Sequence, residues 1–168
     1  MSWVDEVRSL IPGYAKDISL NLDNVINRST LDEVTVKGVA LASAYAAGNM
    51  DLVNKIKDFM LEEDKNAALT AAALMAMNNV WYPYVEMTED PALKGLPAQL
   101  RMNAYATHGG TTKVKFESYA LAASIVGKCH FCVKNHYDVL KKEGLTVEQL
   151  RDVGRIAAVI NAVAKVYG

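Results

Sequence analysis

Strong helix formers fill nearly every segment between the glycines and prolines of this chain, and this feature limits the fold most. The stretch 67–77 (AALTAAALMAM) is typical, because Ala, Leu and Met are among the best helix formers. No run has the strict apolar–polar alternation of a strand rich in Val, Ile and Thr. The best strand candidate, 80–85, contains Pro83, which cannot donate a hydrogen bond in a central strand. We therefore expect an all-α fold, with a helix end and a loop at 80–85.

Capping signals indicate where the helices begin and end. A Ser or Thr three residues before Glu or Gln forms a capping box at a helix start, and Gly commonly ends a helix. By these rules Thr30 opens a helix that stops at Gly48, and Thr146 opens the last one. The expected helices cover residues 30–47, 51–61, 66–81, a start at Thr111 or Thr112 through 126, 129–143 and 146–167, with first turns at Pro91 and Pro97.

The length of 168 residues suits one domain, and its two halves share a short pattern. The tripeptide Ala-Leu-Ala occurs at 40–42 and again 80 residues later at 120–122. We therefore expect a single helical domain over 1–168 with two similar halves, 1–88 and 89–168, which an internal duplication would explain.

The charge pattern excludes several classes of partner. The chain carries 18 Lys and Arg against 19 Asp and Glu, a balance without the basic excess of a nucleic-acid-binding domain. Its first residues include acids and lack the apolar core of a secretory signal, and no uninterrupted apolar run is long enough to span a membrane. We expect a cytoplasmic protein that binds neither nucleic acid nor membrane.

Both cysteines lie in one tetrapeptide, Cys129-His130-Phe131-Cys132. A disulfide between residues three apart closes a loop too short to stabilise a fold much. In a reducing compartment a Cys-x-x-Cys pair more often serves redox or metal chemistry. The pair is therefore the candidate reactive centre.

A helix over 129–143 would place Cys129, Cys132 and His136 on one face, at i, i+3 and i+7. Side chains three apart are close enough for a disulfide to form and break. His136 is four residues past Cys132 but about 10 Å along the axis from Cys129, so it would deprotonate Cys132. Cys129 would lie in the first turn, where free backbone N–H groups favour a thiolate.

Glu117 is predicted to join this group from the preceding helix. If the chain reverses at Gly127, Glu117 and His136 both lie about 14–15 Å from the corner, side by side. A carboxylate there can orient the imidazole and raise its basicity. The expected relay runs from Glu117 through His136 to Cys132 and then to Cys129, nearest the exposed corner.

The spacing Glu-x11-Cys-x2-Cys-x3-His resembles the motif of the alkyl hydroperoxidase D (AhpD) family, in the carboxymuconolactone decarboxylase superfamily. The residues that carry the resemblance are Glu117, Cys129, Cys132 and His136, within the text FESYALAASIVGKCHFCVKNHYDVLKKEGLT. The helical pattern and length agree over nearly the whole chain.

This resemblance implies a thiol–disulfide oxidoreductase with alkyl hydroperoxide reductase activity, in an all-helical, commonly trimeric protein. Its implied partners are the peroxiredoxin component of an alkyl hydroperoxide reductase system and a lipoyl-bearing acyltransferase, whose dihydrolipoyl group supplies electrons, with no cofactor bound. By resemblance, Cys132 attacks peroxide, Cys129 is the more exposed thiol that forms mixed disulfides, and Glu117 and His136 pass protons.

One departure from the family pattern concerns the position before the second cysteine. Some AhpD proteins carry a functional His there, whereas this chain has Phe131 and places His130 one step earlier. One step on a helix turns a side chain by about 100°, so His130 cannot take over that role.

Other classes of function remain open at this point. One is a structural or zinc-binding helical protein, with Glu117, His130 or His108 completing a site with the cysteines. Another is a decarboxylase of the same superfamily acting on a cyclic lactone acid, although members of that type generally lack the cysteine pair. A third is a reductase with a different partner.

Overall fold

The computed structural model describes residues 1–167, and within them every regular element is helical. The all-α prediction is therefore confirmed. The elements are α1 (Trp3–Arg8), η1 (Gly13–Ala15), α2 (Lys16–Asn27), α3 (Glu33–Ala47), α4 (Met50–Lys57), α5 (Glu62–Thr88), α6 (Pro91–Lys94), α7 (Asn103–Ala106), η2 (His108–Gly110), α8 (Lys113–Gly127), α9 (His130–Lys142) and α10 (Val147–Val166). None of the helices in this range is long and apolar enough to cross a membrane.

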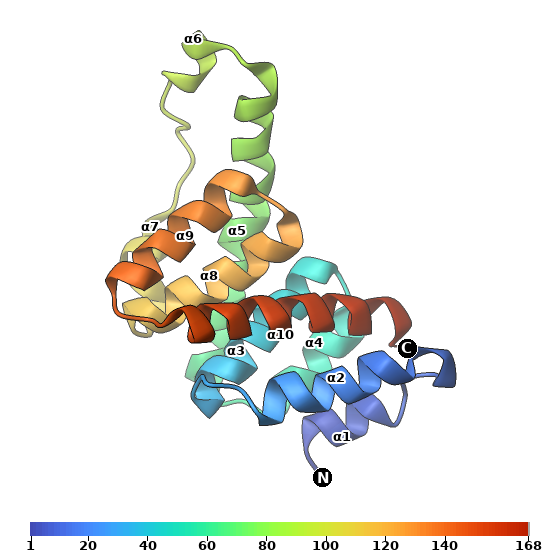
Figure 1. The fold of residues 1–168 in the computed structure, drawn as a ribbon. Coiled ribbons are helices and arrows are strands. Elements are labelled where there is room, and N and C mark those ends of the chain that lie inside the picture. The colour runs from blue at the N-terminus through green and yellow to red at the C-terminus, as the bar shows by residue number, and fades with distance from the viewer. Residues whose placement is uncertain (168) are drawn as a thin grey trace.

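The core is built around α3 and α8, which pack against each other and against α5 and α10 (Figure 1). Both central helices are rich in Ala, Ser and Gly, so their backbones can approach closely. At one crossing Gly38 of α3 lies under the ring of Tyr119 of α8, and any Cβ at position 38 would collide with that ring. This packing fixes α8, and therefore the residues that α8 presents to α9.

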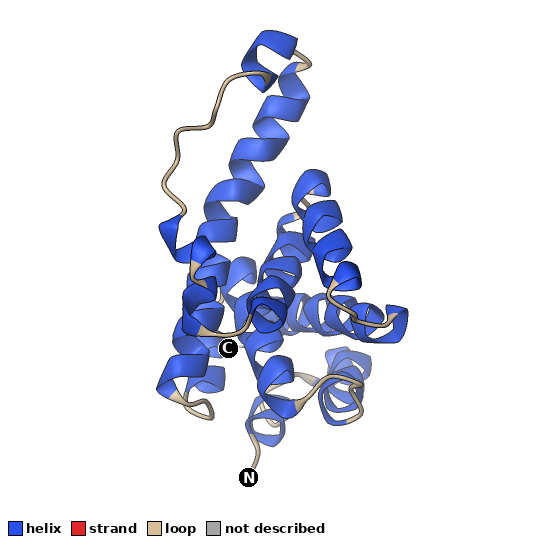
Figure 2. Ribbon diagram, turned by 90° about the vertical axis from the view of Figure 1, so that its left-hand side faces the viewer, coloured by secondary structure: helices blue, strands red, loops and turns tan. Residues whose placement is uncertain are grey.

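An arm projects from this body, formed by the C-terminal half of α5, by α6 and by the extended return at 95–102 (Figures 1 and 2). The predicted helix end and loop at 80–85 is wrong, because α5 continues to Thr88 with Pro83 inside it. Proline removes one backbone hydrogen bond, at a cost of about 3 kcal/mol. The long helix tolerates that loss because its first half is anchored in the core, by residues such as Ala68 and Ala72.

Several predicted helix ends are confirmed and others are displaced. Gly48, with φ of 82°, ends α3, Thr112 caps α8, and Thr146 forms a capping box with Gln149 at the start of α10. Pro91 opens α6 as predicted, whereas Pro97 lies in an extended segment. Two helices differ in extent, since α4 ends at Lys57 and α5 begins at Glu62.

The predicted cap at Thr30 is wrong, because Asp32 caps α3 instead. The Asp32 carboxylate accepts a hydrogen bond from the backbone N–H of Thr35 at 2.9 Å. Thr30 makes a tertiary contact in its place, since its backbone N–H and its hydroxyl donate to the buried carboxylate of Asp152 at 2.8 and 2.7 Å. Here a hydrogen-bond partner 122 residues away in the sequence overrides the local capping pattern.

The two helix pairs α3–α4 and α8–α9 repeat with the offset that the sequence pattern suggested. Both members of the second pair start 80 residues after their counterparts, at Lys113 against Glu33 and at His130 against Met50. The caps also correspond, because Asn49 and Cys129 each accept a hydrogen bond from the backbone N–H three residues on. The common origin of the halves 1–88 and 89–168 stays a prediction.

Candidate functional site

The cysteine pair lies at the corner between α8 and α9. α8 ends at Gly127, and the chain reverses through Lys128, whose φ is 56°. The corner is therefore one residue later than the predicted turn at Gly127. Gly127 has a different role: a Cβ there would collide with the side chain of Asn79, so α8 and α5 approach closely beside the site.

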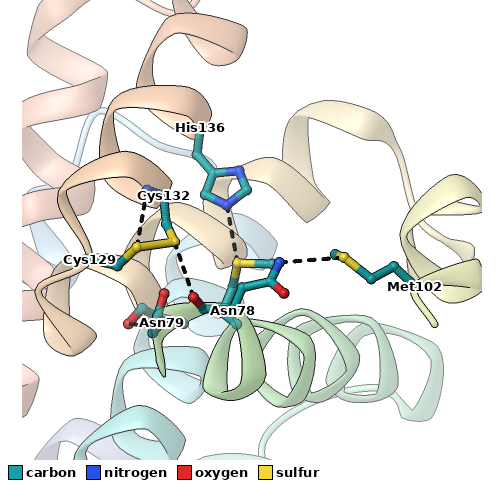
Figure 3. Close-up of a disulfide and its surroundings, with 8 residues drawn as sticks. Asn78, Asn79, Met102, Cys129, Cys132 and His136 are labelled. Carbon is teal, nitrogen blue, oxygen red and sulfur yellow. Dashed lines mark hydrogen bonds between the residues drawn. A yellow bond between two sulfur atoms is a disulfide. The ribbon is translucent and has the colours of Figure 1, made fainter. Parts of the chain in front are cut away.

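Cys129 and Cys132 are joined in a disulfide, with their Cα atoms 5.3 Å apart (Figure 3). Cys129 is the N-cap of α9 rather than a first-turn residue, and its Sγ accepts the backbone N–H of Cys132 at 3.2 Å. The expectation that the helix N-terminus supports the Cys129 sulfur therefore agrees with the geometry. A free backbone N–H of this kind stabilises a thiolate.

The prediction that Cys129 is the more exposed thiol is wrong for this structure. Cys129 is 0% exposed and Cys132 is 3% exposed. The reason is the cap itself, because the Cys129 side chain folds back over the first turn of α9. Of the two cysteines, Cys132 is the one that lines a cavity.

The predicted pairing of Glu117 with His136 is confirmed. Glu117 Oε2 lies 2.6 Å from His136 Nδ1, and both residues are nearly fully buried, at 2% and 3% exposure. An ionised carboxylate only accepts hydrogen bonds, so Nδ1 carries a hydrogen and the neutral ring leaves Nε2 free to take a proton. The pair therefore holds His136 in the tautomer that a general base requires.

Tyr105 is a site residue that the sequence analysis missed. Its hydroxyl donates to Glu117 Oε1 and lies 3.4 Å from His136 Nδ1. Burial, followed by the hydrogen bond to Glu117 and the charge of that carboxylate, raises the pKa of the Tyr105 phenol far above its usual range. Tyr105 therefore stays protonated and remains a donor to Glu117.

The last link of the predicted relay differs from expectation. His136 Nε2 lies 3.1 Å from the Sδ of Met75, and the Cys132 Sγ faces the backbone carbonyl of Asn78 at 3.8 Å (Figure 3). The ring does not contact the Cys132 sulfur directly in this disulfide form. The Met75 sulfur can accept a hydrogen bond, although weakly, and cannot donate one. The contact therefore becomes a hydrogen bond when Nε2 carries a proton.

His136 and Cys132 instead meet across a cavity of about 360 Å³. Its walls come from α5, α7, α9 and the extended return of the arm, and consist of Asn78, Tyr82, Met102, Tyr105, Ala106, Phe131, Cys132, Asn135 and His136. A molecule in this cavity, or a water, could connect the imidazole to the sulfur. The arrangement can therefore deliver a reactant to a buried sulfur beside a positioned base.

The remaining candidates lie outside the relay. His130 is exposed on α9, and His108 lies against Phe116 with ring centroids 6.1 Å apart. Within residues 1–167 no group of three or more His, Cys, Asp or Glu side chains is placed to hold a metal ion. The zinc alternative also requires two free thiolates, whereas these sulfurs are bonded to each other.

The Glu117 carboxyl is expected to make folding pH-dependent. Burial alone raises its pKa, but hydrogen bonds from His136 and Tyr105 outweigh burial and hold the pKa below the ordinary 4.5. A lowered pKa in the folded state stabilises the protein above the unfolded value, and this stabilisation is lost as pH falls through the folded value. The unfolding free energy of the wild type is therefore expected to fall below about pH 4.5 more steeply than that of Glu117→Gln. Denaturant titrations between pH 3 and 7 measure this, and parallel curves would contradict it.

A helical hairpin that carries a disulfide beside a buried acid–imidazole pair defines a dithiol–disulfide protein. The family model described as "Carboxymuconolactone decarboxylase family" matches residues 91–167, which include the whole hairpin. Over 167 residues the chain is 41% identical to the alkyl hydroperoxide reductase AhpD of Rhodospirillum centenum, covering 97% of this chain and 89% of that protein. It is 38% identical to the protein of the same name from Maricaulis maris, covering 97% and 96% of the two chains. The AhpD of Coxiella burnetii is 41% identical over 163 residues. The chain belongs to the AhpD family of the carboxymuconolactone decarboxylase superfamily.

Proposed function

We propose that this protein is a thiol–disulfide oxidoreductase that reduces alkyl hydroperoxides in antioxidant defence. The observation that carries the proposal is the Cys129–Cys132 disulfide, with Cys132 lining a cavity that also contains His136 of the Glu117 pair. The relatives named alkyl hydroperoxide reductase AhpD supply the substrate class. A decarboxylase would have no use for a redox-active pair, so the disulfide favours the reductase.

The proposed reaction begins from the reduced dithiol. The Cys132 thiolate, formed by loss of its proton to His136 through the cavity, attacks the terminal oxygen of the hydroperoxide. An S–O bond forms as the O–O bond breaks, and the alkoxide takes the proton from His136 and leaves as an alcohol. Cys132 is then a sulfenic acid. Glu117 stabilises the imidazolium while it holds the proton, which is the usual role of the acid in such a relay.

The second half of the reaction forms the disulfide. The Cys129 sulfur attacks the Cys132 sulfur, so that an S–S bond forms, the S–O bond breaks and the oxygen leaves as water. One hydroperoxide and two thiols thus give one alcohol, one water and one disulfide. The N–H of Cys132, which already contacts the Cys129 sulfur at 3.2 Å, favours the attacking thiolate.

A dithiol must then return two electrons and two protons. We propose that a dihydrolipoyl group of a lipoyl-bearing acyltransferase does so, because a lipoyl group is thin enough to enter a cavity whose reactive sulfur is 3% exposed. The reduced dithiol form is proposed also to reduce the peroxiredoxin component of the alkyl hydroperoxide reductase system in the cytoplasm, and to become the Cys129–Cys132 disulfide as it does so. The resemblance assigns the mixed disulfides to Cys129 as the more exposed thiol. Because Cys129 is 0% exposed and Cys132 lines the cavity, we propose instead that incoming thiols attack the Cys132 sulfur.

The protein is further proposed to be a homo-oligomer, with a trimer favoured. The arm supports this proposal, since Val80, Met87 and Leu96 are 71%, 80% and 64% exposed on it. Large apolar side chains exposed along one projecting segment are a common feature of association surfaces. Light scattering of the protein in solution measures the mass, and a monomer would contradict the proposal.

The test of the function is a peroxide assay with dihydrolipoamide as the electron donor. The wild type is expected to consume tert-butyl hydroperoxide and dihydrolipoamide in equal amounts. Thiol titration is expected to find two free thiols per chain after reduction and none after peroxide. Two thiols that persist with excess peroxide, together with bound zinc by metal analysis, would support the structural or zinc-binding class instead.

Tyr105→Phe is expected to slow the peroxide reaction and to move its acid limb to higher pH. The variant removes a hydrogen bond that lowers the Glu117 pKa, so that pKa is expected to rise. The pH profile of kcat/KM measures the shift. Tyr119→Phe is the matched control, because the buried Tyr119 hydroxyl on α8 has no hydrogen-bond partner among the described residues. An unmoved profile in Tyr105→Phe would remove Tyr105 from the mechanism.

A further inference from the structure

A stacked pair of aromatic side chains borders the reactive cysteine and has no part in the relay. Phe131, directly before Cys132, is 53% exposed. Its ring stacks on that of Tyr82 from α5, with centroids 4.6 Å apart and planes inclined by 26°. We call Tyr82 and Phe131 the aromatic wall. A half-exposed Phe beside a catalytic thiol contributes little to the core, so its place at the site calls for another explanation.

Both rings of the aromatic wall line the cavity, and the amide side chains of Asn78 and Asn135 lie one helical turn from them. Met102 adds a further apolar surface, while Tyr105, His136 and Cys132 supply the groups that can act on a peroxide. A cavity of about 360 Å³ is far larger than hydrogen peroxide needs and is of a size that takes small organic ligands. The cavity thus combines reactive groups with exposed aromatic surface.

The cavity wall also lacks charged groups that would select an ionic ligand. Among the described residues that line it there is no Lys, Arg, Asp or Glu, and Glu117 is buried behind His136 and Tyr105. Apart from His136 while it holds the Cys132 proton, an anionic substrate such as a fatty acid hydroperoxide would find no cation there for its carboxylate. The chemistry therefore fits an uncharged organic group.

We propose that the aromatic wall binds the organic part of an uncharged aryl or bulky alkyl hydroperoxide, and so makes the site selective for such substrates over hydrogen peroxide. This inference rests on the proposed peroxidase function and names its substrate class. Aromatic rings pack favourably by offset stacking or edge contacts with Tyr and Phe. Seated there, the organic group leaves the peroxide oxygens toward Cys132 and His136.

The test compares kcat/KM for cumene hydroperoxide and hydrogen peroxide in the wild type, Phe131→Ala and Tyr82→Ala. Each variant is expected to lose roughly ten-fold in kcat/KM for cumene hydroperoxide, as expected for lost apolar contacts in a pocket. The change for hydrogen peroxide is expected to stay within about two-fold, since that molecule has no organic part. Phe131→Leu, which keeps an apolar side chain, is expected to fall between wild type and Phe131→Ala.

Two controls separate this inference from the proposed function. Tyr14→Ala removes a side chain that is 85% exposed and does not line the cavity, and it is expected to leave both substrates unaffected. NMR measures the binding of cumyl alcohol to the oxidised protein and so tests the aromatic wall without turnover. This binding is expected to weaken in both alanine variants. Equal losses of kcat/KM for both peroxides, with unchanged alcohol binding, would contradict the proposed substrate-binding role of the aromatic wall. A wild type that consumes neither peroxide, yet binds the alcohol at the wall, would instead overturn the peroxidase function.

Discussion

Replacing Cys132 with serine is expected to abolish peroxide turnover, a loss of at least about 10³-fold, because serine is not a nucleophile at this site without its own activation. Because Cys132 lines the cavity and Cys129 does not, we assign the first attack on the hydroperoxide to Cys132. Turnover is also expected to fail in Cys129→Ser, since no disulfide can form. The two variants differ in single turnover, where Cys129→Ser still forms a sulfenic acid that dimedone traps.

The two serine variants are matched controls for each other. They remove opposite ends of one disulfide that closes only a short loop, so both are expected to fold and to show similar stability. Mass spectrometry after addition of dimedone and one equivalent of peroxide detects the dimedone adduct of the sulfenic acid. A dimedone adduct in Cys132→Ser and none in Cys129→Ser would reverse the assignment of the attacking sulfur.

Glu117→Ala is expected to combine a large loss of activity with a large loss of stability. It leaves the His136 ring buried without the carboxylate that lies 2.6 Å from its Nδ1 and fixes the tautomer of the ring. Removing the carboxylate leaves the His136 Nδ1–H and the Tyr105 hydroxyl without their acceptor, and each unsatisfied buried donor costs about 1–3 kcal/mol. Loss of an oriented general base is expected to slow the peroxide step by about 10²-fold or more. Denaturant unfolding and stopped-flow kinetics of the reduced protein measure the two effects.

Asp152→Ala separates the two effects, because Asp152 is an equally buried carboxylate that neither lines the cavity nor bonds to a relay residue. It is 2% exposed and bonds to Thr30 and Arg155. Its replacement is expected to lower stability without slowing the peroxide step in the fraction that remains folded. If Asp152→Ala slowed that step as much as Glu117→Ala does, loss of stability alone would explain the Glu117 result.

Most of the site could be predicted because its residues lie in one hairpin. Glu117 lies ten residues before Gly127 and His136 nine residues after it, so the helix rise predicts that they lie side by side, although the chain reverses one residue later, at Lys128. Cys129 shows the limit of that argument. The sequence places it near the helix start, but only the capping geometry decides that its sulfur turns inward and is covered.

Tyr105 could not be predicted because no helical spacing links it to the relay. It lies in the short helix α7, and its position depends on how the arm returns along the body. The same tertiary dependence explains the error at 80–85, where anchoring of α5 in the core outweighs the local effect of Pro83. Thr30 likewise follows a distant partner, Asp152, instead of its local pattern. Errors of this kind arise wherever contacts between distant segments outweigh local preference.

The most direct test of the central claim is peptide mapping of the reduced wild type after one equivalent of organic hydroperoxide. A single product is expected, the Cys129–Cys132 disulfide within one chain, with one alcohol released per chain. Recovery of both cysteines as free thiols, or of disulfides only between chains, would contradict it.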